Sequence, residues 1–233
     1  MHVSIYKDRR KTLDIIRRAE SAGFAAVVLS VDVATLGIRL NEYRNDFQLP
    51  SDITMPMLVD DGTISADAKH LQWDPSITWE ESIRWLREHT RMEIWLKGIL
   101  SSEDVALAIE HGVDGVLISN HGGRQLDGVP ATLDVLRECA PIAKNKIKLG
   151  IDGGIRRGSD IFKALALGAD LCFVGRVPLW GLAYNGEDGV DLAIKILLRE
   201  FETTMILCGC KSVKEISKAH LSILKPDGLL CRL

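Results

Sequence analysis

The sequence has neither a surplus of one charge nor a long apolar run. Its 29 Lys and Arg residues almost balance 32 Asp and Glu residues, which leaves a formal net charge of -3. No basic stripe stands out, so the composition does not favour binding to nucleic acid. No apolar run approaches the ~20 residues that a membrane-spanning helix needs. The first residues, "MHVSIYKDRRK", lack the apolar core of a signal peptide, so we expect neither secretion nor membrane association.

The five cysteines lack the spacing of a disulfide framework or of a zinc site. Their odd number and scattered positions are typical of a protein from a reducing compartment. Cys208 and Cys210 form a C-x-C pair without a second cysteine pair or a nearby histidine, so we expect helix packing there and no bound metal. The last residues, 231–233, resemble the S-K-L peroxisomal address. The predicted location is therefore cytoplasmic or peroxisomal, with an exposed tail that carries no signal as the alternative.

Short apolar runs alternate with amphipathic stretches along most of the chain. The runs are rich in Val, Ile and Leu, as in strands that are covered on both faces. The strand candidates are 3–6, 25–32, 93–99, 115–119, 148–154 and 171–176. Helical patterns between them end at Gly23, Gly112 and Gly168, and residues 190–209 suggest one long helix before a looser tail. The alternation predicts an α/β protein with a parallel sheet.

Residues 40–80 do not follow this alternation of strand and helix patterns. They contain Pro50, Pro56 and Pro75 and show neither a helical nor a strand period. A long insertion between two strands is often a lid or a substrate loop, so we expect an active-site loop there. No low-complexity tract or linker divides the chain, and its length suffices for one large core. We therefore expect a single domain over 1–233.

Charged side chains follow strand after strand. Those with a candidate role are Asp32 and Arg39 after the second strand, Lys97 at the end of the third, His121 and Arg124 after the fourth, Asp152 and Arg156 after the fifth, and Arg176 after the sixth. In a β/α barrel the carboxyl ends of the strands carry the active site. The pattern therefore predicts that these side chains share one site.

Two glycine-containing turns suggest a phosphate site. "DGGIRRG" (152–158) and "VGR" (174–176) each follow a strand and precede a helix. Glycines let backbone N–H groups approach an anion, and in β/α barrels the last two loops commonly bind phosphate. Arg156 and Arg176 would add charge-assisted hydrogen bonds. The alternative is that the glycines make tight turns and the arginines are solvated.

A histidine lies in the glycine-rich segment "SNHGGRQLDG" after the fourth strand. We interpret His121 as a proton acceptor, with Asp32 able to orient its ring, although a structural histidine is the alternative. Arg39 and Arg124 are suited to holding a carboxylate. Lys97 either meets an anion or a polarised ring, or extends to solvent at the barrel rim. Together these groups indicate redox or proton chemistry at a carbon beside a carboxylate.

These segments resemble a known family. "SNHGGRQLDGVPATLDVL" is similar to the signature of the FMN-dependent α-hydroxy acid dehydrogenases and oxidases, the group of glycolate oxidase and lactate oxidase. "YKDR", "SVDVATLGIR", "RNDFQLP", "WLKGI", "DGGIRRGSDIFKALALGA", "FVGR" and "EFETTMILCGC" extend the resemblance over essentially the whole chain. It implies a TIM (β/α)8-type barrel, FMN as cofactor, and oxidation of a small 2-hydroxy acid to a 2-oxo acid. Oxygen or another electron acceptor, and a homo-oligomer, are further expectations.

The resemblance also implies a role for each candidate. His121 would be the base and Asp32 its support. Arg39 and Arg124 would bind the substrate carboxylate. Lys97 would lie near the N1/O2 edge of the flavin and stabilise the anionic reduced ring. The remaining positions would contact the flavin ring, the ribityl chain or the phosphate, and they are Ser30, Ser119, Asp152, Gly153, Gly154, Arg156, Gly175 and Arg176.

Two features depart from the family. The family barrel has eight strands, and the candidates here match its third to eighth, so we expect an incomplete barrel with two unpaired edges. The third family strand carries a Q-x-Y pattern, whereas this sequence has His2 and Ser4 there, with Tyr6 two residues later. By this resemblance His2 replaces a glutamine that contacts the flavin, and an active-site tyrosine is missing.

Two other interpretations stand beside an active oxidase. In the first, the chain is a truncated or degenerate family member without independent activity. In the second, it is one of the FMN-binding barrel enzymes that use a catalytic cysteine. The second is disfavoured because Cys172 lies within a strand candidate and no cysteine lies in a glycine loop at a strand end.

Overall fold

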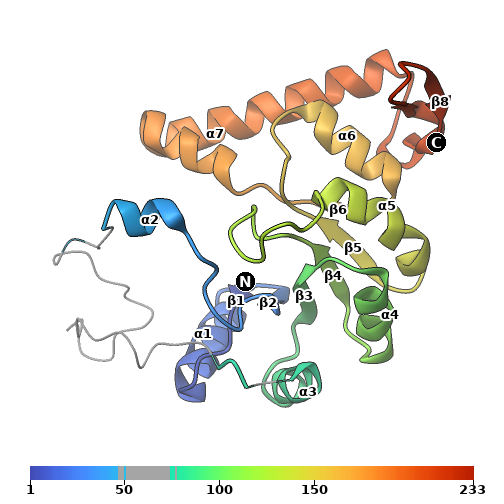
Figure 1. Cartoon of the computed structure of the whole chain (residues 1–233). Helices are drawn as coiled ribbons and strands as arrows, with labels where there is room; N and C mark the ends of the chain where they lie inside the picture. The colour runs from blue at the N-terminus through green and yellow to red at the C-terminus, as the bar shows by residue number, and fades with distance from the viewer. Residues whose placement is uncertain (47–49, 51–73, 77) are drawn as a thin grey trace.

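The computed structural model describes residues 1–46, 50, 74–76 and 78–233, and its centre is a six-stranded parallel sheet (Figure 1). Neighbouring strands follow chain order from β1 to β6. Their bounds are β1 His2–Val3, β2 Ala26–Ser30, β3 Glu93–Ile99, β4 Gly115–Ile118, β5 Lys148–Ile151 and β6 Leu171–Cys172. Each predicted apolar run overlaps one of these strands, so the predicted α/β class with a parallel sheet is confirmed.

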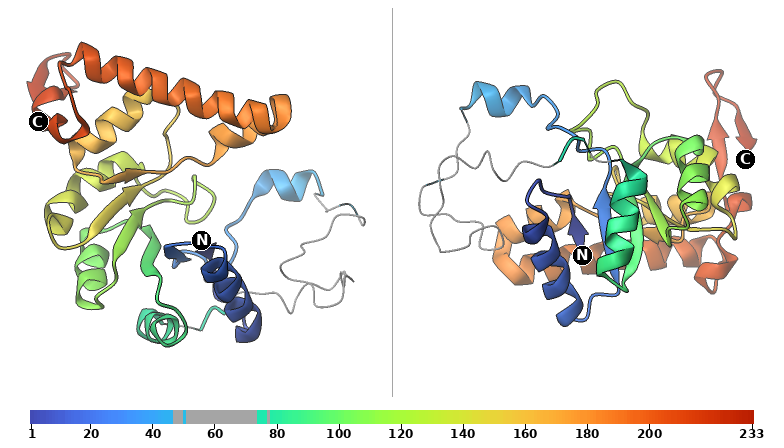
Figure 2. Two further views of the ribbon diagram at one scale, coloured as in Figure 1. Left: turned by 180° about the vertical axis from the view of Figure 1, so that it is seen from behind. Right: turned by 90° about the horizontal axis from the view of Figure 1, so that it is seen from below.

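Helices connect the strands, and all of them except α2, which stands apart from the sheet, lie around its outer side (Figures 1 and 2). Their bounds are α1 Arg9–Ser21, α2 Leu40–Arg44, α3 Trp79–His89, α4 Ser102–Glu110, α5 Thr132–Ala143, α6 Gly158–Leu167 and α7 Arg176–Leu207, with 3₁₀ turns at Val213–Glu215 and Lys218–His220. Helices α4, α5, α6 and α7 contact one another in that order. The carboxyl ends of the strands are thereby left for the connecting loops.

The main hydrophobic core lies between the sheet and these helices. Alternate strand residues, such as Val27 and Leu29 on β2, are buried within it. Val116 and Ile118 on β4 repeat the pattern and are fully buried. Because side chains alternate between the two faces of a strand, the residues between them face the concave interior of the sheet. Ser30 and Lys97, which lie opposite each other in the β2–β3 register, belong to this interior set.

Helix ends follow the local signals in the sequence. The hydroxyl of Thr78 accepts a hydrogen bond from the Glu81 backbone, and the Glu81 side chain accepts one from the Thr78 backbone, so α3 begins with a capping box. Ser101 Oγ accepts from the Asp104 backbone at the start of α4, as the Ser-x-x-Asp spacing predicts. Gly168 ends α6 in the left-handed conformation, with φ 115°.

The C-terminal part differs from the sequence prediction in two respects. The long helix begins at Arg176, because α7 joins two helical segments across non-helical dihedral angles at Asn185 and Gly186. The tail forms an antiparallel hairpin of β7 Ser222–Leu224 and β8 Leu230–Arg232. Two of the three residues that resemble a peroxisomal address, Cys231 and Arg232, are therefore paired in this hairpin.

The predicted active-site loop, 40–80, lies mostly outside the described residues. Its described parts are α2, residues 45–46, 50, 74–76 and 78, and the beginning of α3. Within the part of the chain that the structure describes, no helix is both long enough and apolar enough to cross a bilayer.

The sheet is open at both edges. Among the described residues, β1 pairs with β2 alone and β6 with β5 alone. Large apolar side chains are also exposed at the start of α7, including Trp180 at 73% and Tyr184 at 79% of their full accessibility. Unpaired parallel edges next to exposed apolar surface favour association with another polypeptide.

We therefore expect the purified chain to self-associate. Sedimentation velocity should give an apparent mass that rises with protein concentration. Replacing Trp180 and Tyr184 together by lysine should shift the distribution towards monomer, because it removes apolar area and adds like charges. The control is Leu229→Lys in the β7–β8 turn, which should not change association. A wild-type chain that stays monomeric at every concentration would contradict this expectation.

Candidate active site

The loop after β4 has an unusual backbone. His121, Gly122 and Gly123 all have positive φ angles, of 57°, 67° and 74°. The turn is closed by the Gly123 amide, which donates to the Asn120 carbonyl at 2.9 Å and to Asn120 Oδ1 at 3.2 Å. A non-glycine residue in this region costs about 1 kcal/mol. His121 is one of the described non-glycine residues with a positive φ angle, so this cost is present at the loop.

The imidazole of His121 is held by a carboxylate from the neighbouring loop. Nδ1 of His121 lies 3.1 Å from Oδ2 and 3.3 Å from Oδ1 of Asp32, which follows β2. Both side chains are mostly buried, with 19% and 14% exposed. Asp32 also packs against the backbone of Gly98, where a β carbon would lie 2.5 Å from the carboxyl carbon. This arrangement fixes the ring and leaves Nε2 available to accept a proton.

Lys97 is paired inside the sheet. Its Nζ donates to Ser119 Oγ at 2.8 Å and lies 3.4 Å from Asp152 Oδ2. The Ser119 hydroxyl in turn accepts from the His121 amide at 3.2 Å. Lys97 is 13% exposed, so these partners offset the cost of burying its charge. The alternative of a lysine that extends to solvent at the rim is therefore wrong.

Below this charged layer the interior is filled. The ring of Trp95 lies against the backbone of Gly115 and Gly150, so closely that a β carbon at Gly115 would lie 2.3 Å from the ring. Leu117 is also buried on this face. These side chains therefore block approach to the charged layer from the amino ends of the central strands.

The two predicted phosphate turns present open backbone. A β carbon at Gly154 or Gly175 would meet no heavy atom within 4 Å. The turn that contains Gly153 is held by its carbonyl, which accepts from Thr132 Oγ1 at 3.2 Å. Arg156 is anchored by its backbone amide, which donates to Asp160 Oδ2 at 3.0 Å, and it is exposed. This backbone can contact an anion closely.

Arg176 joins the second phosphate turn to the histidine loop. Its Nη2 donates to the Gly122 carbonyl at 2.9 Å. The alternative interpretation required a solvated guanidinium at this position, whereas the group is hydrogen-bonded to the backbone. This contact places a positive charge between the loops that follow β4 and β6.

The two predicted carboxylate-binding arginines lie on loops that touch. A β carbon at Gly37 would lie 2.4 Å from the Arg124 carbonyl oxygen, so the loop that leads to Arg39 packs backbone to backbone against the loop of Arg124. Arg39 bonds to Glu42 at 3.1 Å, and its buried Nε has no hydrogen-bond partner within the described residues. Arg124 is exposed, and no described residue forms an ion pair with it. The structure thus brings the loops together, but it does not show both guanidinium groups converging.

Gln125 makes this junction, and the sequence analysis did not identify it. Its Nε2 donates to the Asp32 carbonyl at 2.7 Å and to the Thr35 carbonyl at 2.9 Å, while its Oε1 accepts from the Gly37 amide at 3.0 Å. One side chain therefore ties the histidine loop to the loop of Asp32. No local pattern reveals this role, because the partners are about ninety residues away in the chain.

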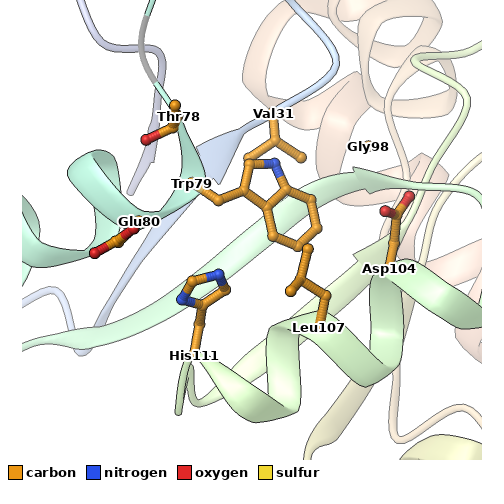
Figure 3. Close-up of a pocket in the computed structure, with 8 residues that line it drawn as sticks. All are labelled: Val31, Thr78, Trp79, Glu80, Gly98, Asp104, Leu107 and His111. Atoms are coloured by element: carbon orange, nitrogen blue, oxygen red, sulfur yellow. The ribbon is translucent and has the colours of Figure 1, made fainter.

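A separate cavity of about 530 Å³ lies outside the sheet (Figure 3). Trp79 of α3 and Leu107 and His111 at α4 line it, with the indole of Trp79 at its centre (Figure 3). Gly98 also lines it, on the segment that Asp32 packs against. None of the predicted site residues lines this cavity, so the chemistry is expected at the strand ends instead.

Removal of the Gln125 side chain should loosen both loops without unfolding the protein. We expect Gln125→Ala to raise the hydrogen-exchange rate of the Gly37 amide by about fivefold, since a net hydrogen bond is worth roughly 1 kcal/mol. Gln125→Glu keeps the acceptor for Gly37 and should protect that amide better than alanine does. Leu126→Ala, at the exposed neighbouring residue, is the control. Equal exchange in wild type and Gln125→Ala would show that the junction does not hold the loops.

Comparison with known proteins gives a consistent result. An oxidase named FUB9 from Fusarium oxysporum f. sp. lycopersici is 51% identical over 99% of this chain. Human 2-hydroxyacid oxidase 1 is 45% identical over 94% of it. A mandelate oxidase structure superposes with a TM-score of 0.81 and 39% identity, covering 91% of this chain and 59% of its own. The chain spans 61% of the FUB9 oxidase and 62% of the human enzyme.

The comparison also confirms the predicted fold class. The oxidases that superpose on the chain have the TIM-barrel fold, and the chain matches about 60% of their length, as expected of an incomplete (β/α)8-type barrel. The model of the family described as "FMN-dependent dehydrogenase" matches residues 1–223. The chain therefore belongs to the FMN-dependent dehydrogenase family.

Proposed function

We propose that this chain carries the catalytic face of an FMN-dependent enzyme that oxidises a small 2-hydroxy acid to a 2-oxo acid. The observation that carries the proposal is the His121–Asp32 pair. In this proposal the pair would present Nε2 of His121 as the proton acceptor, at the same end of the sheet as Lys97 and the open glycine turns. The human relative named 2-hydroxyacid oxidase and the mandelate oxidase structures support the substrate class. Oxygen as the electron acceptor is supported by the name oxidase that these relatives share.

The residues present fit FMN. Oδ1 of Asp152 is buried and has no hydrogen-bond partner in the described part of the chain, as expected where a ribityl hydroxyl would donate. The open backbone at Gly154 and Gly175, with Arg156 and Arg176, suits the phosphate. Ser30, Lys97, Ser119 and Gly153 complete the predicted contacts, the first three on the interior face of the sheet. When bound, FMN would accept the two electrons of the reaction.

His121 would act as the base. Its Nε2 would take the proton of the substrate hydroxyl, and the negative charge of Asp32 would stabilise the imidazolium that forms. Because Asp32 already bonds to Nδ1, the ring needs no reorientation. The base acts in its neutral form, so protonation of His121 before substrate binds would stop the reaction.

Arg39 and Arg124 would bind the substrate carboxylate. The unpartnered Nε of Arg39 has hydrogen-bonding capacity left for an anion, and Arg124 has no competing ion pair among the described residues. The contact between their loops, held by Gln125, would set the separation of the two guanidinium groups. A carboxylate held in this way would place the adjacent hydroxyl near His121.

A second candidate is a family member without independent activity. The open edges at β1 and β6 favour it, because an unclosed sheet leaves the cofactor exposed on one side. One experiment separates the two functions. The purified chain is mixed with FMN, dialysed and examined for the visible flavin spectrum, and then assayed on a panel of 2-hydroxy acids with oxygen and dye acceptors. Retained flavin with turnover supports the enzyme, whereas flavin that is lost at every concentration supports the inactive alternative.

Substitution of the base should separate catalysis from cofactor binding. We expect His121→Gln to lower kcat at least a hundredfold, the usual contribution of general base catalysis. Flavin content should remain near that of wild type, because His121 is not among the proposed main flavin contacts. His111→Gln, on α4 and outside the sheet interior, is the control. Loss of flavin with retained turnover would exclude the proposed role.

Substitution of a carboxylate-binding arginine should act mainly on substrate affinity. We expect Arg124→Met to raise KM roughly tenfold to a hundredfold, since a hydrogen bond to a charged group contributes about 1.5–3 kcal/mol. A smaller fall in kcat should accompany it, because a misplaced substrate is poorly oriented. Arg137→Met, at an exposed position of α5, provides the control. An unchanged KM for carboxylate substrates would remove Arg124 from the site.

A further inference from the structure

A second histidine lies on the interior face of the sheet. His2 is the first residue of β1 and pairs in register with Val28 of β2. Its neighbour Val3 is buried in the core on the helix side, so the His2 side chain faces the concave interior. There its Nε2 lies 2.7 Å from Oγ of Ser30, one of the predicted flavin contacts. The structure thus fixes the imidazole at the edge of the proposed flavin site.

The surroundings of His2 include the charged groups of the site. Desolvation lowers the pKa of His2 from its ordinary value, the electrostatic influence of Lys97 and of the His121 ring lowers it further, and Asp32 and Asp152 act in the opposite direction. These four neighbours belong to β3 and to the segments that follow β2, β4 and β5. The amino group of Met1, which donates to the Ala26 carbonyl at 2.6 Å, is the other ionisable group beside it in the chain. His2 is therefore electrostatically part of the site.

We propose that His2 is a further positioning residue of the flavin site, one that carries a switchable charge: held by Ser30, its imidazole adds a positive charge near the isoalloxazine ring when it is protonated. This inference rests on the proposed function. It adds to the fixed charge of Lys97 a second charge that depends on pH. A charge beside the ring is one of the ways in which a protein adjusts the electronics of a flavin.

The consequence follows from the charge balance of reduction. A neutral oxidised flavin that takes up two electrons and one proton becomes an anionic reduced ring. That new negative charge attracts a proton to His2, so reduction takes up additional protons over the pH range between the pKa of His2 in the two states. Below that range His2 is charged in both states, and the reduced ring is favoured. Above it His2 is neutral in both, and its charge has no effect.

The test measures the midpoint potential of the bound flavin as a function of pH. FMN-loaded wild-type protein and His2→Gln are equilibrated with reference dyes under anaerobic conditions. Glutamine can still bond to Ser30 but cannot be protonated. At the acid end of the range, the wild-type potential should exceed that of the variant by a margin equivalent to at least tenfold in the reduction equilibrium, or about 30 mV for two electrons. The margin should disappear as the pH rises. His111→Gln should match wild type throughout.

Each outcome decides the matter. If the midpoint potentials of wild type and His2→Gln are equal, or differ by an amount that does not change with pH, the role of His2 is overturned and the proposed function stays intact. Failure of the wild-type chain to retain FMN overturns both. If His2→Gln loses its flavin, the comparison of midpoint potentials is replaced by an NMR titration of the His2 imidazole in the wild-type protein, once with oxidised and once with dithionite-reduced flavin. The His2 signal is assigned from its absence in the variant. A higher pKa in the reduced protein supports the inference, and an equal pKa overturns it.

Discussion

Parallel pairing of six strands in chain order places Ser30, Lys97 and Ser119 at neighbouring positions on one face of the sheet. Ser30 lies opposite Lys97 in the register of β2 and β3. Lys97 in turn lies opposite Leu117, two residues before Ser119. The hydrogen bonds between strands thus align residues that are far apart in sequence. A shift of the register by one residue would turn the side chains of a strand to the opposite face of the sheet. The observed register is therefore needed to bring the lysine, the serines and the carboxylates to the same face.

Inside that frame, charged groups are stabilised by one another. Lys97 has Ser119 and Asp152, and His121 has Asp32. One buried atom of the layer, Oδ1 of Asp152, has no hydrogen-bond partner among the residues that the structure describes. Most of the polar atoms in this charged layer thus have hydrogen-bond partners, and Trp95 fills the interior below it. We expect such an arrangement where a polar ligand supplies the missing hydrogen bonds.

The open sheet affects the site as well as the stability. The chain matches about three-fifths of the length of its relatives, and among the described residues each edge strand of its sheet pairs on one side alone. His2 on β1 is at one of these edges, whereas His121 and Lys97 lie in the middle of the sheet. The central part of the site is therefore held on both sides by neighbouring strands. The positions of the groups at the edges depend in addition on what packs against those edges.

The sequence by itself determined the α/β class, the approximate positions of all six strands, and the candidate groups His121, Asp32 and Lys97, because local periodicity and glycine-rich turns directly express how a short segment folds. It did not reveal the helical segment from Arg176 to Tyr184, whose packing depends on a turn at Gly186.

Only the tertiary structure decided that Gln125 joins two loops and that Arg176 bonds to Gly122. It also decided that the imidazole of His2 reaches Ser30, twenty-eight residues away in the chain. Each of these contacts joins segments that meet only after the strands have paired. Their existence depends on side-chain length and loop geometry in space, which no pattern within a single segment encodes.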